Sequence, residues 1–145
     1  MAHQVETAFF TRKQAWHGIG NVLNAPPTIE EGIIQAGLDW TVELMPTLYT
    51  DHDGNPQPAP DFRTVVRSSD SSVLSVVKKT WKPVQNRRAF DFFEPFVTNG
   101  SVELEAGGSL QNGKRIWLLG KVKGMEADVT KNDPVEAHLL LYNSH

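Results

Sequence analysis

Basic and aromatic residues that could bind a polyanion are concentrated in the middle of the chain. Lysine and arginine side chains contact phosphate groups, and an exposed indole can stack on a nucleic-acid base, which is worth about 1–3 kcal/mol. The alternative is that the cations are solvated and that Trp81 belongs to the core, since tryptophan is usually well buried. The candidate nucleic-acid-binding residues are Lys78, Lys79, Trp81, Lys82, Arg87, Arg88, Lys114 and Arg115.

The histidines do not have the spacing of a catalytic or metal-binding motif. His17 could act as a general acid or base near neutral pH, but spacing identifies no second catalytic group beside it. His138 and His145 lie seven residues apart, and a metal site would need further ligands. We therefore expect no catalytic residues, no metal ion and no cofactor.

Two short segments are rich in residues that fix backbone geometry. The glycines of the first segment permit a positive φ or a close backbone approach, so we interpret it as a shaped turn in which the imidazole of His17 bonds to backbone. In the second segment, Asn86 is well placed to cap the helix that follows. The candidate structural-motif residues are Trp16, His17, Gly18, Gly20, Pro83 and Asn86.

The elements that must position these residues begin with a short helix and three strands. Thr28 and Glu31 form a capping-box pattern at the start of a helix over 29–37. Apolar residues then alternate in three segments, which short polar links join into an antiparallel meander. We expect its strands over 40–50, 62–67 and 73–77. Residues 51–60 contain Asp-Gly and three prolines, which predicts an exposed loop.

The second half of the chain predicts a helix, a hairpin and a last strand. A helix over 87–97 would bury an aromatic face that includes Phe90, Phe93 and Phe96. Asn-Gly at 112–113 supplies the hairpin turn. Residues 135–142 are nearly continuously apolar, so we expect a central strand buried on both faces. At a sheet edge the same strand would seek a partner strand and favour a homo-oligomer.

This order of elements predicts an α+β fold with a mostly antiparallel sheet. It consists of a three-stranded meander, a helix, a hairpin and a final strand, with two short helices on the sheet. The length of 145 residues fits a single domain over 1–145. Within it we expect residues 1–12 to be loosely held unless Val5, Phe9 and Phe10 anchor them.

Composition excludes several classes of protein. The absence of cysteine excludes disulfides, thiolate metal ligation and a cysteine nucleophile. No stretch approaches the ~20 apolar residues of a membrane span, and the first residues lack a signal-peptide pattern, so we expect a cytoplasmic protein without a membrane partner. The formal net charge is −3, but residues 61–123 carry eleven Lys/Arg against six Asp/Glu. A local basic patch could therefore still steer a polyanion.

Several short motifs follow one another in an order that resembles a known family. They are Trp16-His17-Gly18-x-Gly20, Gly37-Leu38-Asp39-Trp40, Val66-Arg67, Pro83-Val84-Gln85-Asn86 with Ala89-Phe90, Gly108-Ser109-Leu110, Gly113-x-Arg115-x-Trp117 and Leu140-Leu141-Tyr142-Asn143-Ser144-His145. On these motifs the chain resembles the N-terminal part of the phage/plasmid-like protein family, a domain of unknown function carried by phages, plasmids and integrated elements. The resemblance implies a mobile-element protein and brings no established catalytic mechanism. Members of that family continue for about another domain's length, so we expect a natural short version, a cut form or one product of a split gene.

Three functional hypotheses follow from these observations. The leading one is a non-enzymatic nucleic-acid-binding protein of a phage or plasmid that acts on single strands in recombination or element establishment. Its order of three antiparallel strands and a packing helix is similar to the core of phage single-strand annealing recombinases, which bind DNA strands in a basic groove. A rival is a counter-defence protein that binds a host protein or signalling ligand. A third is part of an enzyme whose other half is absent.

Overall fold

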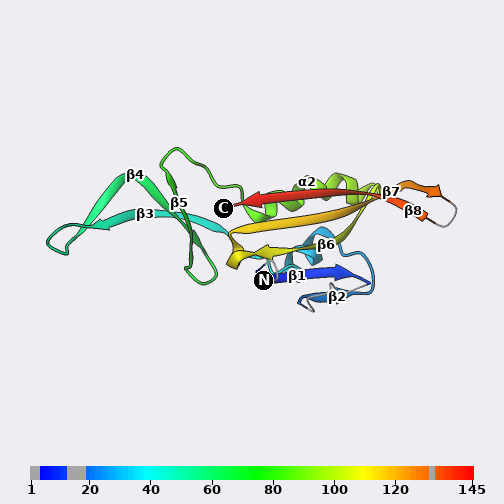
Figure 1. Ribbon diagram of the computed structural model, residues 1–145, viewed down its shortest axis with the longest axis horizontal. Coiled ribbons are helices and arrows are strands. Elements are labelled where there is room, and N and C mark those ends of the chain that lie inside the picture. The colour runs from blue at the N-terminus through cyan, green and yellow to red at the C-terminus, as the bar shows by residue number, and fades with distance from the viewer. Residues whose placement is uncertain (1–3, 13–18, 131–132) are drawn as a thin grey trace.

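The computed structural model describes residues 4–12, 19–130 and 133–145, and it has the predicted α+β fold. Figure 1 shows an elongated molecule in which a three-stranded sheet projects from one end of a five-stranded sheet. Trp16, His17 and Gly18 of the predicted turn lie outside the described residues. Gly20 has a φ of +108°, and a Cβ there would lie 2.7 Å from the carbonyl oxygen of Ala8, so this position requires glycine.

The five-stranded sheet has the order β2-β1-β6-β7-β8, and among the described strands only β1 and β2 pair in parallel. Its strands are β1 (Val5–Thr11), β2 (Asn21–Leu23), β6 (Val102–Leu110), β7 (Arg115–Thr130) and β8 (Asp133–Ser144). Residues 5–11 are not loose but take the anchored alternative, because β1 lies between β2 and β6. Phe9 anchors it in the core, with none of its surface exposed.

The last strand, β8, is not the central strand that its apolar sequence predicts. It forms an edge of the sheet, paired with β7 alone among the described strands. Leu140 is 66% exposed and Tyr142 is 49% exposed, whereas Leu141 packs against the core. The nearly continuous apolar run therefore does not reflect burial on both faces within this chain.

The three-stranded sheet, called the meander below, is antiparallel throughout, as predicted. Its strands are β3 (Val42–Thr50), β4 (Pro56–Arg67) and β5 (Val73–Lys78). The predicted loop over 51–60 is too long, because β4 already begins at Pro56 and pairs with β3 there. N–H groups alternate sides along a strand, so prolines at 56, 58 and 60 remove donors from one side and leave the other able to pair.

The helices are α1 (Ile29–Gln35) and α2 (Asn86–Thr98), and both pack on the five-stranded sheet. The capping box of α1 is confirmed, since the Glu31 N–H donates to Thr28 Oγ1 at 3.2 Å. The prediction that Asn86 caps α2 is wrong, because Gln85 is the N-cap residue and Asn86 is fully buried in the first turn. Within the described residues, no helix has the length and apolar character needed to cross a membrane.

The core lies between the helices and the five-stranded sheet and reaches the base of the meander. Phe90 and Phe93 of α2 are fully buried, as predicted, but Phe96 is 39% exposed. Phe96 lies one turn after Phe93 and contacts the exposed ring of Phe92, with 6.1 Å between the two ring centroids. The hairpin between β6 and β7 turns through a 3₁₀ turn, η1 (Gln111–Gly113), at the predicted Asn-Gly.

Candidate functional site

Polar side chains from separate parts of the chain meet in a buried junction where the meander joins the main sheet. We call Glu6, Trp40, Arg67, Asn86, Ser109 and His145 the polar junction. Arg67, Asn86, Ser109 and His145 are each at most 8% exposed. Five of the motifs that carry the family resemblance contribute a residue to it. What the motifs share is therefore a common place in the fold.

One half of the polar junction is a buried ion pair. Arg67 Nη1 donates to Glu6 Oε1 at 2.5 Å, and Ser109 Oγ donates to the other oxygen of the same carboxylate at 2.7 Å. The guanidinium carbon lies 4.5 Å from the centre of the Trp40 ring. The charges are thus paired, hydrogen-bonded and covered by an aromatic face, which is what a buried ion pair needs to be tolerated.

The other half is a buried amide–imidazole pair. Asn86 Nδ2 donates to the carbonyl oxygens of Leu38 and Trp40, at 3.3 and 3.2 Å. Asn86 Oδ1 lies 2.8 Å from His145 Nε2, and because an amide oxygen only accepts, the proton sits on Nε2. His145 Nδ1 is buried without a hydrogen-bond partner among the described residues. Burial lowers the pKa of His145 to about 4, so the ring is neutral at pH 7.

Contacts next to the polar junction hold the segment 79–85, which connects β5 to α2. The side chain of Gln85 makes two hydrogen bonds to the first residue of β3. It accepts from the Val42 N–H at 2.8 Å and donates to the Val42 carbonyl at 2.9 Å. Asn143 near the end of β8 donates to the Val84 carbonyl at 3.3 Å. Pro83 lies half-buried in this segment. These contacts set the position of the basic residues in this segment.

The predicted nucleic-acid-binding cations all lie on the surface, but only some have free charge. Lys79 pairs with Asp61 at 2.9 Å, and Arg87 pairs with Glu30. The others are exposed and have no acidic partner among the residues that the structure describes. These are Lys78, Lys82, Arg88, Lys114 and Arg115. Trp81 is half-buried and packs against the core, so the alternative interpretation describes it better than stacking does.

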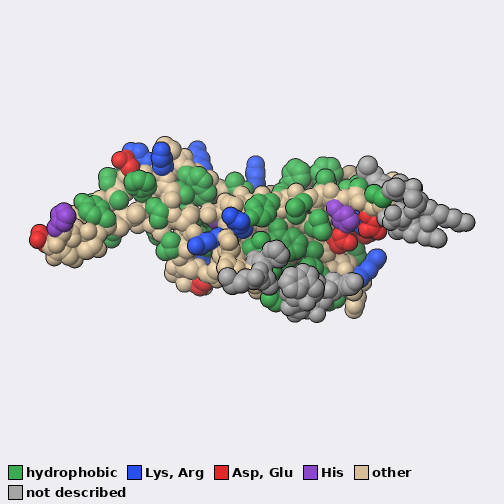
Figure 2. Space-filling view, viewed as in Figure 1, with side chains coloured by type: hydrophobic (Ala, Val, Ile, Leu, Met, Phe, Trp, Pro, Cys, Tyr) green, Lys and Arg blue, Asp and Glu red, His purple; other side chains and the backbone are tan. Residues whose placement is uncertain are grey.

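Two of the basic segments lie on either side of the end of β8. Arg115 pairs in register with Ser144, and Asn143 bonds to Val84, two residues after Lys82. Lys114 accepts the backbone N–H of His145 through its carbonyl at 2.8 Å. Figure 2 shows Lys and Arg side chains spread over the meander and the middle of the molecule, with uncharged surface between them. The cations therefore form separate groups instead of one continuous groove.

Sequence reasoning missed an exposed aromatic ring beside one of these groups. Phe62 of β4 is 44% exposed and lies directly across from Lys78 of β5 in the register of the meander. With Asp61, Lys79 and Thr80 they line a shallow hollow of about 380 Å³, called the meander hollow below. The signal was the period of two, which places Phe62 on the opposite face from buried Val65.

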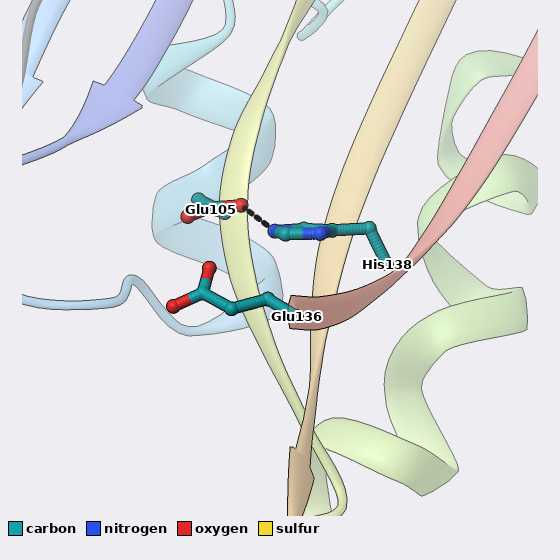
Figure 3. Close-up of side chains that lie close together, drawn as sticks. All are labelled: Glu105, Glu136 and His138. Atoms are coloured by element: carbon teal, nitrogen blue, oxygen red, sulfur yellow. Dashed lines mark ion pairs between the residues drawn. The ribbon is translucent and has the colours of Figure 1, made fainter. Parts of the chain in front are cut away.

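A second cluster lies on the face of the five-stranded sheet that is turned away from α2. Glu105 of β6 and Glu136 and His138 of β8 lie with one ligand atom of each within 4.8 Å of the others. Figure 3 shows the imidazole of His138 reaching Glu105, and their atoms Nε2 and Oε2 are 2.6 Å apart. Glu136 also pairs with Lys121 of β7 at 3.0 Å. We call these three residues the β6–β8 cluster.

Comparison with known proteins assigns a family. Residues 73–145, from β5 to His145, match the family described as a domain of unknown function, DUF932. The match covers half of the chain, and the chain belongs to this family. No curated protein and no solved structure matches the chain.

Proposed function

We propose that the protein is a non-enzymatic nucleic-acid-binding protein of a phage or plasmid that holds single strands during recombination or element establishment. The observation that carries this proposal is the exposed ring of Phe62 beside the ammonium group of Lys78, which has no acidic partner among the described residues. A ring for stacking next to a cation for phosphate is the basic unit of single-strand recognition. The sequence resemblance to phage and plasmid proteins supports the proposed source.

The meander hollow favours a single strand over a duplex. The faces of bases in a duplex are stacked on one another, whereas a single strand can turn a base onto the ring of Phe62. A phosphate on either side of that base then reaches Lys78. The neighbouring Lys79 is paired with Asp61, so the next cation along the chain without an acidic partner among the described residues is Lys82. Because the cations form separate groups, we expect few phosphate contacts and a moderate dependence on salt.

The first experiment measures binding of labelled single-stranded DNA and of the matching duplex by fluorescence anisotropy across a salt series. Phe62→Ala should weaken single-strand binding about 10-fold without changing the slope of log affinity against log salt, because stacking releases no counterions. Lys78→Ala with Lys82→Ala should lower that slope by about one to two units.

Two variants serve as matched controls. Phe92 of α2 is a similarly exposed ring, so Phe92→Ala should leave affinity unchanged. Lys123 is an exposed lysine that pairs with Glu103 at 3.1 Å, so Lys123→Ala should leave the salt slope unchanged. Absence of single-strand binding at low salt would overturn the proposal, as would equal losses in Phe62→Ala and Phe92→Ala.

A counter-defence function is a second candidate that one observation favours. The face of the meander that carries Phe62 also exposes Met45, Val73 and Val76, each more than 40% accessible. Phosphate recognition has no use for such aliphatic surface, whereas a protein partner would bury it. A nuclease-resistant complex with a host protein that Val76→Lys abolishes would favour this candidate over nucleic-acid binding.

A further inference from the structure

We infer that the β6–β8 cluster is a binding site for a first-row divalent metal ion such as Zn²⁺. The inference is independent of the proposed nucleic-acid binding, since the cluster belongs to the main sheet and the meander hollow does not. One imidazole nitrogen and two carboxylate oxygens are a donor set that suits Zn²⁺, Mn²⁺ and Fe²⁺, whereas Mg²⁺ and Ca²⁺ prefer oxygen ligands alone.

The sheet brings the three side chains together from non-adjacent strands. The register pairs Lys121 with both Glu103 and His138, so these residues share one face across β6, β7 and β8. Glu105 has no partner in β7, because the register shifts between Leu104 and Ala106. Thr11 Oγ1 donates to the carbonyl oxygen of Glu105 at 2.9 Å and holds this bulge. A bulge of this kind re-aims a side chain, here across β7 toward His138.

The distances are close to those of a metal centre. An ion with ligands at about 2.0–2.2 Å needs donor atoms about 3.0–3.5 Å apart. The Glu105–His138 pair, now at 2.6 Å, has to open by less than about 1 Å, and Glu136 lies within 4.8 Å of both. The three side chains are 30–42% exposed, so an ion can enter from solvent and keep water in its remaining positions.

A small polar hollow adjoins the cluster and gives such water a place. It has a volume of about 40 Å³, and Thr11, Glu103, Glu105 and Lys121 are among the residues that line it. A space of roughly 10–15 Å³ is enough for one water molecule. Arg12 also lines this hollow, so the three carboxylates Glu103, Glu105 and Glu136 are matched by three cations, Arg12, Lys121 and Lys123.

Lys121 would compete with the metal ion for the carboxylate of Glu136. Lys121 holds Glu136, and the metal must take that carboxylate from it. Replacing this lysine by an uncharged residue of similar length therefore frees a ligand without removing one. Lys121→Met should bind the metal more tightly than the natural chain, an outcome that non-specific surface binding does not produce.

The test is isothermal titration of the metal-free protein with Zn²⁺, with Co²⁺ absorption as a second readout of the ligand geometry. We expect one ion per chain, a loss of affinity of at least about 10-fold in His138→Ala and in Glu105→Gln, and a gain in Lys121→Met. His52→Ala is the control, because His52 also stands between two carboxylates, Asp51 and Asp53, but in a surface turn. Circular dichroism checks that each variant is folded.

Two results would overturn the inference. One is the absence of a stoichiometric titration in the natural chain and in Lys121→Met. The other is binding that survives His138→Ala but is lost in His52→Ala, which would assign the ion to the turn at 51–53.

Discussion

The side chain of Asn86 uses both ends of its amide inside the protein. Its nitrogen donates to two carbonyls of the segment that leads into β3, and its oxygen accepts from His145. An asparagine at the start of a helix usually caps it, and that usual role made the sequence prediction wrong. The residue instead ties α2 to the chain before β3 and to the last residue.

The stability of the protein should decrease as the pH is lowered, because His145 is buried in its neutral form. The pKa of His145 is about 4 in the folded protein and about 6.5 in the unfolded chain. Between these pH values the unfolded chain binds a proton that the folded chain does not bind, and this favours unfolding. The contribution is complete above pH 6.5 and is lost progressively toward pH 4, by about 3 kcal/mol at most. Urea unfolding at pH 7.5, 5.5 and 4.5 measures it.

A matched variant separates this residue from the carboxylates, which also titrate in acid. His145→Gln keeps a donor for Asn86 but cannot take up a proton, so its loss of stability between pH 7.5 and 4.5 should be smaller. An unchanged pH dependence in His145→Gln would contradict the assignment.

Individual functional residues were predictable only where sequence fixes their exposure. The charged side chains at 78–88 were expected on the surface and lie there. Whether a particular cation is free depends on partners such as Glu30 and Asp61, which come from other elements. Glu105 was not predictable as a ligand candidate, because the register of three strands brings it to His138. Alternation within one strand does not contain that information.

At the scale of elements, Gly113 shows how tightly the hairpin turn is packed. It has a φ of +89°, and a Cβ there would lie 2.8 Å from Trp40 Cζ2. Gly54 in the turn before β4 has a similar φ of +84° but no atom within 4 Å of a built Cβ. The two glycines therefore share their backbone conformation and differ in their surroundings.

Substitution of both glycines by alanine separates backbone strain from packing. Gly54→Ala should lower the free energy of unfolding by about 1–2 kcal/mol through backbone strain alone. Gly113→Ala should lose a further amount of about 1–3 kcal/mol, because the methyl group overpacks against Trp40. Chemical denaturation of the two variants measures the difference, and equal losses would show that the ring of Trp40 moves aside freely.

The elements themselves were largely predictable from the sequence. The capping box, the antiparallel meander and the hairpin turn each depend on local chemistry and were confirmed. The start of β4 was missed because prolines usually exclude a central strand, whereas here β5 is too short to reach that part of β4. The edge position of β8 in the five-stranded sheet was not predicted, because apolar content alone does not distinguish a buried central strand from an exposed edge strand.

At the scale of the whole molecule, β8 leaves an apolar edge exposed. Proteins usually protect an edge strand with charges, prolines or a short length, and residues 139–142 have none of these features. The opposite edge, β2, has three residues and offers little to pair with. We propose that two copies of the chain pair antiparallel along β8 and cover Leu140.

Light scattering coupled to size exclusion tests this association. The natural chain should run as a dimer at high protein concentration. Leu140→Lys should run as a monomer, because a lysine on an edge strand disfavours strand addition and the paired copies would bring like charges close together. Leu48→Lys is the control, since Leu48 is about as exposed but lies on the meander. A monomeric natural chain at high concentration would rule the pairing out.

The prolines of β4 have a consequence for self-association of the chain. The meander projects from the rest of the molecule (Figure 1). Strands of other copies of the chain could therefore add to its edges and build a fibre. Residues 56, 58 and 60 offer no N–H to an incoming strand, so the outer part of β4 cannot template such growth. The prolines therefore protect the outer part of β4 against the addition of another strand.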